Sequence, residues 1–230
     1  MKPSDVYQVL KGIGATHLHH ANTVTTSCTF LEHAALLSRG YVEKHGLAQT
    51  DQSSDEIDKK YGIWDRVFVD HVDIHYRGGR VKGPNQYGPV LFVFGLDLLL
   101  TLPTASDVVV TKMNPIYWQD SQSDGDRWYL TPEELAKNIK YGDFDKMLVI
   151  QTIDGKVDLP GKQAQIALDE PQRKLSSGKE AYAFAEERLR QSAKAGGVTV
   201  GITKHDCRPD CSCVEKYKGC DQEYFETMFA

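Results

Sequence analysis

The chain has 230 residues, of which 40% are hydrophobic and 26% charged, and its formal net charge is −5. This size and composition are typical of a globular protein with one sizeable core. No segment approaches the roughly 18 consecutive apolar residues of a membrane-spanning helix. The acidic balance argues against binding of nucleic acid through a generally basic surface. A nucleic-acid substrate would therefore have to be bound locally, in a pocket.

The first ten residues, "MKPSDVYQVL", contain no apolar segment of the kind found in export signals. We therefore expect a cytoplasmic protein that does not associate with a membrane. In that compartment the five cysteines are expected to be free or metal-bound rather than paired in disulfides.

Apolar periodicity, glycines and capping residues predict the elements of the first half of the chain. These are a helix at 4–12, a strand at 15–20, a helix at 27–39 capped by Thr26 or Ser27 and ended by Gly40, a polar loop at 47–60 with one helical turn as an alternative, one or two strands within 66–76, and turns at 77–88.

The second half is expected to contain strands at 89–94, 107–111, 146–152, 164–170 and 198–202, with helices at 130–139 and 178–197. The strand at 89–94 is apolar on both faces, which favours a central position in a sheet. Short strands with few helices predict an α+β fold with a mixed, largely antiparallel sheet. The regular β-α-β alternation and glycine fingerprint of a doubly wound nucleotide-binding fold are missing from the sequence.

Three histidines lie within four positions at the end of the first predicted strand, in "ATHLHHANTVTTSC". His17 and His19 share one face of that strand, and His20 points to the other. One interpretation is a metal-dependent nuclease or hydrolase that uses His19 with Asp73 and His75. Another is that histidines at strand ends only bind the backbone, which we favour for His17, and also for His33 and His45.

A third interpretation is a binding site for a nucleotide. A neutral histidine at a strand end can donate a hydrogen bond to a ribose hydroxyl. The hydroxyls of Thr25, Thr26 and Ser27 and the start of the following helix can receive a carboxamide or a phosphate. Asn22 lies between the histidines and these hydroxyls.

The segment "LHHANTVTTSCTFLEHAALLSRG" resembles the opening strand, loop and helix of ADP-ribosyltransferase-fold toxins. It is similar to the DarT-like group, whose opening runs His-x-(Thr/Ala)-x-x-Asn and continues with a helix and "GLLS". The segments "IDKKYGIWDRVFVDHVDIHYRGG" and "NQYGPVLFVF" resemble the substrate loop and paired strands of the same toxins. The resemblance covers roughly residues 15–155. It extends to the RNA-modifying (CmdT-like) toxins of tripartite toxin–antitoxin–chaperone phage-defence systems.

This resemblance implies an ADP-ribosyltransferase-like split sheet. We expect the catalytic domain to span 1–175, with the C-terminal helix, strand and Cys-rich tail at 176–230 packed on it. The resemblance implies NAD as a substrate and single-stranded nucleic acid as the acceptor, with RNA favoured over DNA. It also implies a protein antitoxin and a chaperone as partners. The residues implied in NAD binding are His19, His20, Asn22, Thr26 and Ser27.

Cleavage of the nicotinamide–ribose bond passes through an oxocarbenium-like state, so that the enzyme works mainly by positioning and charge stabilisation. The candidate catalytic residues are His20, Arg39, Tyr61, Glu134 and Gln151. The family's reaction needs an acid, usually Glu, at the start of a late strand. The matching segment "DKMLVIQTIDGKVDL" contains no Glu but holds Asp145, Gln151 and Asp154. Glu133 and Glu134 lie upstream at a predicted helix start. Stabilisation of that helix start is the alternative to a catalytic role for these two acids.

Four cysteines gather near the C-terminus, in the order Cys207, Cys211, Cys213 and Cys220, with His205 beside them. Such a cluster in a cytosolic chain favours a metal site, here structural zinc held by the four cysteines. The spacing C-x3-C-x-C-x6-C is not that of a standard zinc knuckle, and disulfides or free thiols remain alternatives. A zinc-stabilised binding module without enzymatic activity is therefore a third hypothesis. Cys28, inside a predicted helix, is expected to be a small buried residue.

Overall fold

The structure, a computed structural model, describes residues 1–74, 87–207 and 211–230. The first sheet has the strand order β1 (His17–Asn22), β4 (Val90–Gly95), β9 (Gln163–Leu168) and β10 (Thr199–Lys204). Strand β10 runs parallel to β9, and the other neighbours are antiparallel.

The second sheet is antiparallel throughout, in the order β3 (Val67–Val69), β7 (Leu148–Gln151), β5 (Asp107–Thr111) and β6 (Trp128–Tyr129). A two-stranded ribbon is formed by β2 (Ala35–Leu37) and β8 (Lys156–Asp158). The predicted α+β fold with mixed, largely antiparallel sheets is confirmed.

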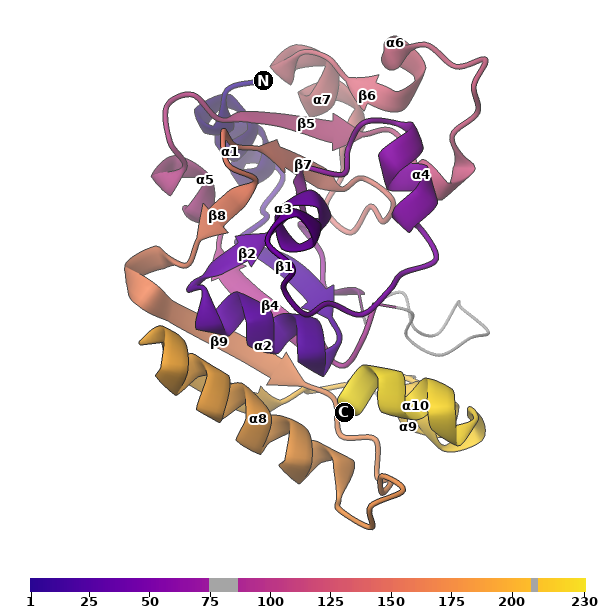
Figure 1. Cartoon of the computed structure of the whole chain (residues 1–230). Helices are drawn as coiled ribbons and strands as arrows, with labels where there is room; N and C mark the ends of the chain where they lie inside the picture. The colour runs from indigo at the N-terminus through magenta and orange to yellow at the C-terminus, as the bar shows by residue number, and fades with distance from the viewer. Residues whose placement is uncertain (75–86, 208–210) are drawn as a thin grey trace.

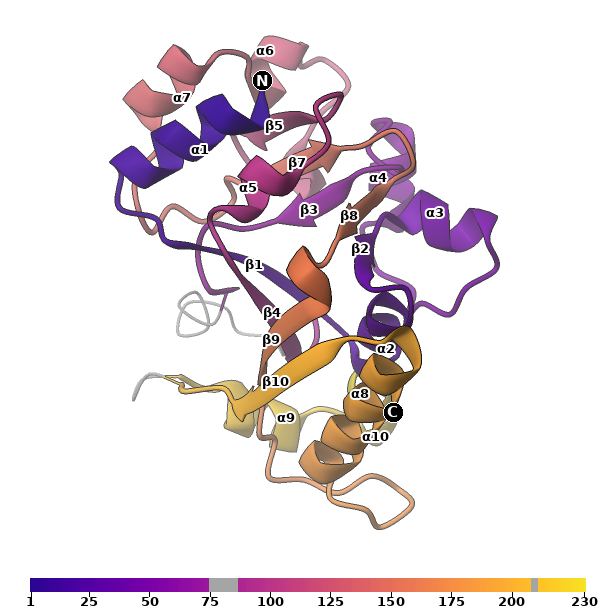
Figure 2. The ribbon, with the colours of Figure 1, turned by 90° about the vertical axis from the view of Figure 1, so that its left-hand side faces the viewer.

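Helices cover the two sheets separately. Near the first sheet, α2 (Val24–Glu32) packs against α8 (Ala181–Gly196), and α10 (Gln222–Phe229) contacts both (Figure 1). At the second sheet, α1 (Pro3–Gly12) contacts α5 (Leu98–Thr101) and α7 (Pro132–Asn138), as Figure 2 shows. The shorter helices are α3 (Arg39–Lys44), α4 (Asp55–Lys60), α6 (Asp124–Arg127), α9 (Cys213–Gly219) and the 3-10 turns η2 (Pro115–Tyr117) and η3 (Pro160–Lys162).

Strand β4 lies inside the core, as its sequence predicts. Its hydrogen-bonded neighbours are β1 and β9, and the side chains of Val90, Leu91 and Phe92 are all buried. Cys28 is also buried, on α2. Within the described residues, no helix combines the length and apolar composition that crossing a membrane would need.

The predicted helix at 27–39 is wrong. Helix α2 begins at Val24, with Thr23 rather than Thr26 or Ser27 as its cap, and it ends at Glu32. Ala34 then adopts a left-handed conformation with φ of 51°. The next three residues form β2, which pairs with β8. Pairing with a strand about 120 residues away outweighs the helical spacing of these apolar residues, because it buries them fully.

Two further predictions agree with the structure in part. The polar segment 47–60 is a loop that ends in α4, which takes the place of the helical turn given as an alternative, and the strand expected within 66–76 is limited to β3 in the described residues. Helices α9 and α10 were not predicted from the sequence. Most of the predicted turn at 77–88 lies outside the described residues, as does His75.

Candidate active site

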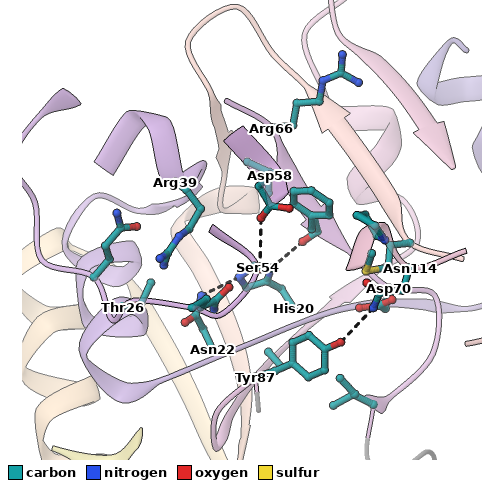
Figure 3. A pocket seen from close by; sticks show the side chains of 18 of the residues that line it. His20, Asn22, Thr26, Arg39, Ser54, Asp58, Arg66, Asp70, Tyr87 and Asn114 are labelled. Carbon is teal, nitrogen blue, oxygen red and sulfur yellow. Dashed lines mark hydrogen bonds between the residues drawn. The ribbon is translucent and has the colours of Figure 1, made fainter. Parts of the chain in front are cut away.

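A cavity of about 180 Å³ lies where the two sheets meet. It is bounded by β1 of the first sheet, β3 of the second, and α2, α3, α4 and the loop that precedes α4. Its polar lining, most of which is labelled in Figure 3, includes His20, Asn22, Thr26, Arg39, Gln49, Asp58, Asp70, Tyr87 and Asn114.

His20 is held at the cavity wall by a main-chain hydrogen bond. Its Nδ1 atom donates to the carbonyl oxygen of Phe68 at 2.6 Å. Because a carbonyl only accepts, the neutral ring carries its proton on Nδ1. Burial lowers the pKa of His20, which keeps the ring neutral. The Nε2 atom therefore accepts hydrogen bonds, which corrects the prediction that it donates one.

Asn22 lies two residues further along β1, next to the Nε2 side of the His20 ring. Its Oδ1 atom accepts the Thr23 amide at 2.9 Å, which directs its Nδ2 group to His20 Nε2 at 3.4 Å. This contact is long for a hydrogen bond. The Asn22 amide is therefore oriented towards the same place as the accepting nitrogen of His20 (Figure 3).

The N-terminus of α2 forms the next part of the wall. Thr23 caps the helix by accepting the Thr26 amide, and its hydroxyl contacts that of Thr50 at 2.7 Å. The Thr26 hydroxyl accepts the Thr50 amide at 3.0 Å. These bonds fasten the loop before α4 over the helix start, where unpaired amides and the helix dipole favour negative charge.

Arg39 extends from α3 into the same region. Its guanidinium forms an ion pair with Asp55 and donates to the Thr50 carbonyl at 2.8 Å. Only 11% of its side chain is exposed. Its Nε atom and the Oε1 atom of Gln49 are buried without a hydrogen-bond partner among the described residues. Two lining side chains thus carry polar atoms that a polar ligand would satisfy.

Two carboxylates line the cavity, and a third lies next to it. Asp58 on α4 is buried, and desolvation raises its pKa to about 7. Asp70 follows β3, and Asp145 lines a small recess that shares Asp70 with the cavity. Asp58 and Asp70 were not predicted, because an acid in the polar segment 51–60 or after a strand carries no distinguishing sequence pattern.

Tyr87 supplies an aromatic side chain to the cavity lining. The Tyr87 hydroxyl accepts a hydrogen bond from Asn114 at 3.4 Å, and Asn114 in turn accepts the Ile116 amide. Asn114 is buried, and its hydrogen bond helps to hold the Tyr87 hydroxyl in place.

The cavity brings together four of the predicted site residues, namely His20, Asn22, Thr26 and Arg39. His19 lies on the opposite face of β1, and Ser27 is fully buried in α2. Neither of these two predicted NAD-binding residues lines the cavity.

Three predicted catalytic residues also lie outside the cavity lining. Tyr61 packs edge-on against Trp118 and donates its hydroxyl to the Trp118 carbonyl. Glu134 pairs with Lys112 and accepts the Leu130 amide, so it stabilises the start of α7. Gln151 is exposed at the end of β7. The geometry gives none of the three a place beside His20.

The metal site of the nuclease hypothesis is not assembled in the described residues, because His75 lies outside them. The Asp73 carboxylate is bound to His205 Nε2 at 2.7 Å. His19 is the third residue of this hypothesis, and burial lowers its pKa to about 4. A different cluster offers metal ligands: the sulfur atoms of Cys207, Cys211 and Cys213 lie within 4.8 Å of one another.

No protein-family model matches the sequence, and no curated protein matches it significantly. Among solved structures, the chain is similar to DarT of Thermus sp. 2.9 in complex with NAD+, with 14% identity over 83% of this chain and 96% of that one and a TM-score of 0.45. DarT of Thermus sp. 2.9 in complex with ADP-ribosylated ssDNA gives 12% identity, 83% and 95% coverage and a TM-score of 0.45. A likeness at this level does not decide the function, which therefore has to be argued from the cavity.

Proposed function

We propose that the chain is an NAD-dependent ADP-ribosyltransferase that modifies nucleic acid, and that the cavity beside His20 binds NAD. One observation carries the proposal. An accepting imidazole nitrogen, an oriented amide, a helix N-terminus and an anchored guanidinium all face one cavity between two sheets.

Each of these groups suits a different part of NAD. In the proposed complex, His20 Nε2 accepts a hydrogen bond from a ribose hydroxyl, and the Asn22 amide binds beside it. The start of α2 and Arg39 offset the negative charge of the pyrophosphate. These contacts would orient the nicotinamide–ribose bond for cleavage. Because hydrogen bonds already hold the side chains of His20 and Arg39 in place, the site would not need to reorganise during the reaction.

Asp58 is the carboxylate that we place in the reaction. In the transfer step, the bond from ribose C1′ to the nicotinamide nitrogen breaks, and C1′ bonds to a nucleophilic atom of the acceptor base. Nicotinamide leaves as a neutral molecule, and the acceptor loses one proton, which the Asp58 carboxylate takes. A pKa of about 7 suits this exchange, because general bases work best when their pKa lies near the working pH.

The acceptor that we propose is an unpaired base, with RNA favoured over single-stranded DNA. Tyr87 at the cavity offers an aromatic face for stacking, a contact worth about 1–3 kcal/mol per base. The net charge of −5 fits an acceptor that is bound locally. We also propose that the activity is that of an intracellular toxin with a protein antitoxin and a chaperone as partners, as the sequence resemblance implies.

The test is transfer of label from NAD carrying a radioactive adenylate phosphate. The purified protein is incubated with single-stranded RNA, single-stranded DNA and duplex DNA of matched sequence. We expect label on a single-stranded acceptor and its loss in His20→Phe, which keeps a ring against Phe30 but removes both nitrogens. The matched control is His17→Phe, an exposed histidine of the same strand, which should transfer normally.

Absence of transfer to all three acceptors, or equal transfer by His20→Phe and wild type, would show the proposal to be wrong. Cleavage of nucleic acid without NAD, abolished by a chelator, would favour the nuclease instead. The toxin role is tested by expression in cells: growth should stop with wild type and continue with His20→Phe.

A further inference from the structure

The thiol cluster near the C-terminus has the dimensions of a metal site. Cys207 follows β10, and Cys213 begins α9. The Sγ atoms of Cys207, Cys211 and Cys213 lie within 4.8 Å of one another, and those of Cys207 and Cys213 are 3.4 Å apart. Zinc–sulfur bonds of about 2.3 Å in a tetrahedron place the sulfurs about 3.8 Å apart. Three sulfur ligands are therefore close to the required positions.

His205 lies beside the Cys207 sulfur at the edge of the cluster, although its ring is not within 4.8 Å of all three sulfurs. Its Nδ1 atom is 3.3 Å from Cys207 Sγ, and its Nε2 atom is 2.7 Å from Asp73 Oδ2. Because an ionised carboxylate only accepts, the Nε2 atom carries the ring proton and, in the neutral ring, the lone pair of Nδ1 faces the Cys207 sulfur. Metal-binding histidines typically donate their other N–H to a carboxylate in this way.

We propose that Cys207, Cys211, Cys213 and the Nδ1 atom of His205 form a structural zinc site, with Asp73 orienting the histidine. Three thiolates and one imidazole are a common closed ligand set for structural zinc. The site does not depend on the proposed transferase activity.

This ligand set differs from the four cysteines that the sequence predicts. The Cys220 thiol donates to the Tyr217 carbonyl at 3.3 Å and receives a contact from Arg173 Nη1 at 3.6 Å. Helix α9 separates Cys220 from Cys213, and Cys220 does not belong to the sulfur cluster. The ligand is instead supplied from the end of β10, two residues before Cys207.

The contacts of His205 also resemble those of a nucleophile, base and acid in a cysteine hydrolase. Two further thiols gathered around the Cys207 sulfur distinguish the two arrangements, since a nucleophile has no need of them. A disulfide between Cys207 and Cys213 is the other alternative and would leave Cys211 and His205 without a shared role.

The site has a structural consequence for the cavity. Asp73 belongs to the short segment after β3, in which Asp70 and Ile74 line the cavity. The zinc, His205 and Asp73 would therefore connect the C-terminal helices to the cavity wall. The two residues that make this connection, His205 and Asp73, are 132 residues apart in the sequence.

The experiment measures metal in the full-length protein purified under reducing conditions. We expect one zinc per chain by elemental analysis, and after exchange for cobalt(II) an absorption spectrum with thiolate charge-transfer and tetrahedral d–d bands. Cys211→Ser and His205→Ala should lose the metal or bind it much more weakly. Cys220→Ser is the matched control, a nearby cysteine outside the cluster, and should keep one zinc.

Asp73→Asn tests the orienting role. It should bind one zinc at saturation, with affinity reduced about 10- to 100-fold in a competition with a chromophoric chelator. Circular dichroism shows which variants remain folded. The proposal is wrong if the wild type binds no zinc when excess metal is added under reduction. It is also wrong if His205→Ala keeps the wild-type affinity and cobalt spectrum, or if Cys220→Ser loses the metal as Cys211→Ser does.

Discussion

The Nδ1 atom of His20 on β1 donates a 2.6 Å hydrogen bond to the main-chain carbonyl of Phe68 on β3. The bond joins the first sheet to the second at the cavity. It lies next to a second connection, the backbone bridge between His19 and Asp70. The His20 bond thus adds to the backbone bridge between the two sheets, and it decides which ring nitrogen of His20 faces the cavity.

The first prediction concerns the protonation of this ring. We expect His20 to be the neutral Nδ1–H tautomer, and to remain neutral when the pH falls through about 6.5, the ordinary histidine value, because burial lowers its pKa. Nitrogen-15 NMR of labelled histidine reports both properties. Binding of NAD should weaken only at still lower pH, where protonation of Nε2 removes the acceptor. An Nε2–H tautomer at neutral pH would contradict the assigned geometry.

The second prediction concerns Arg39. In Arg39→Lys, a positive charge remains but the planar group that binds Asp55 and the Thr50 carbonyl is lost. We expect NAD affinity, measured by calorimetry, to fall on the order of tenfold. Arg39→Ala should in addition lower the free energy of unfolding by about 1–3 kcal/mol, since it leaves a largely buried carboxylate unpaired.

The matched control for Arg39 is Lys59, which pairs with Glu43 on the surface, where both side chains are well exposed. Lys59→Ala should change the free energy of unfolding by less than about 1 kcal/mol and leave NAD affinity unchanged. An equal effect of the two alanine variants would show that Arg39 has no special role.

The third prediction concerns Asp58. Its folded-state pKa of about 7 lies above the ordinary value of 3.8. The folded state therefore binds the proton more tightly, and the stability that this provides is lost as the pH rises from about 4 to about 7. Asp58→Asn removes this dependence and should raise the free energy of unfolding above pH 7 by a few kcal/mol, at about 1.4 kcal/mol per unit of pKa shift.

The same variant should lower the rate of label transfer about 100-fold or more, as expected for loss of a general base. Denaturant unfolding across the pH range and transfer kinetics measure the two effects. Glu56→Gln, an exposed carboxylate on the same helix, is the control and should change neither. Full activity in Asp58→Asn would exclude Asp58 and leave Asp70 and Asp145 as the remaining candidates near the cavity.

The fourth prediction concerns Gly88, which packs against the backbone beside the site. Its φ is 105°, and a Cβ atom there would lie 2.3 Å from the Asn22 carbonyl and 2.5 Å from the Thr23 amide nitrogen. Gly88→Ala should therefore displace Asn22 and weaken NAD binding, in addition to destabilising the fold by about 1–3 kcal/mol through overpacking.

Gly142 is the control for Gly88, because its φ of 89° is similar but a Cβ atom added there would meet no atom within 4 Å. Both alanine variants carry the backbone strain, so the difference between them in unfolding free energy and NAD affinity isolates the contact with Asn22. If both variants bind NAD equally well, the position of Asn22 does not matter for binding.

The parts of the fold with strong local signals could be predicted from the sequence. The helices predicted at 130–139 and 178–197 are α7, which Thr131 caps, and α8, which ends at Gly197 in a left-handed conformation. The double-faced apolar pattern of β4 correctly predicted a central strand. The segment Ala35–Leu37 was misassigned because its partner, β8, is distant in sequence and only pairing with it favours a strand.

The candidate site likewise contains some residues that could be predicted from the sequence and others that could not. His20, Asn22 and Thr26 could be proposed because they follow one another closely along the chain, from the end of a strand to the start of a helix, in a segment that resembles a known family. Asp58 and His205 could not be assigned their roles, because an acid in a polar segment and a histidine after a strand are ordinary surface patterns. In the structure, Asp58 is buried at the cavity, and His205 contacts Asp73 and Cys207.

The sequence by itself determined the α+β class, the strand that presents His20, and the cysteine cluster near the C-terminus. These depend on side-chain periodicity and spacing over a few residues, which the chain carries locally. Only the tertiary structure decided which carboxylates line the cavity, which tautomer His20 adopts, and which histidine lies beside the thiols. Each of these depends on atoms that are distant in sequence, and hydrogen bonding and desolvation act through distance in space alone.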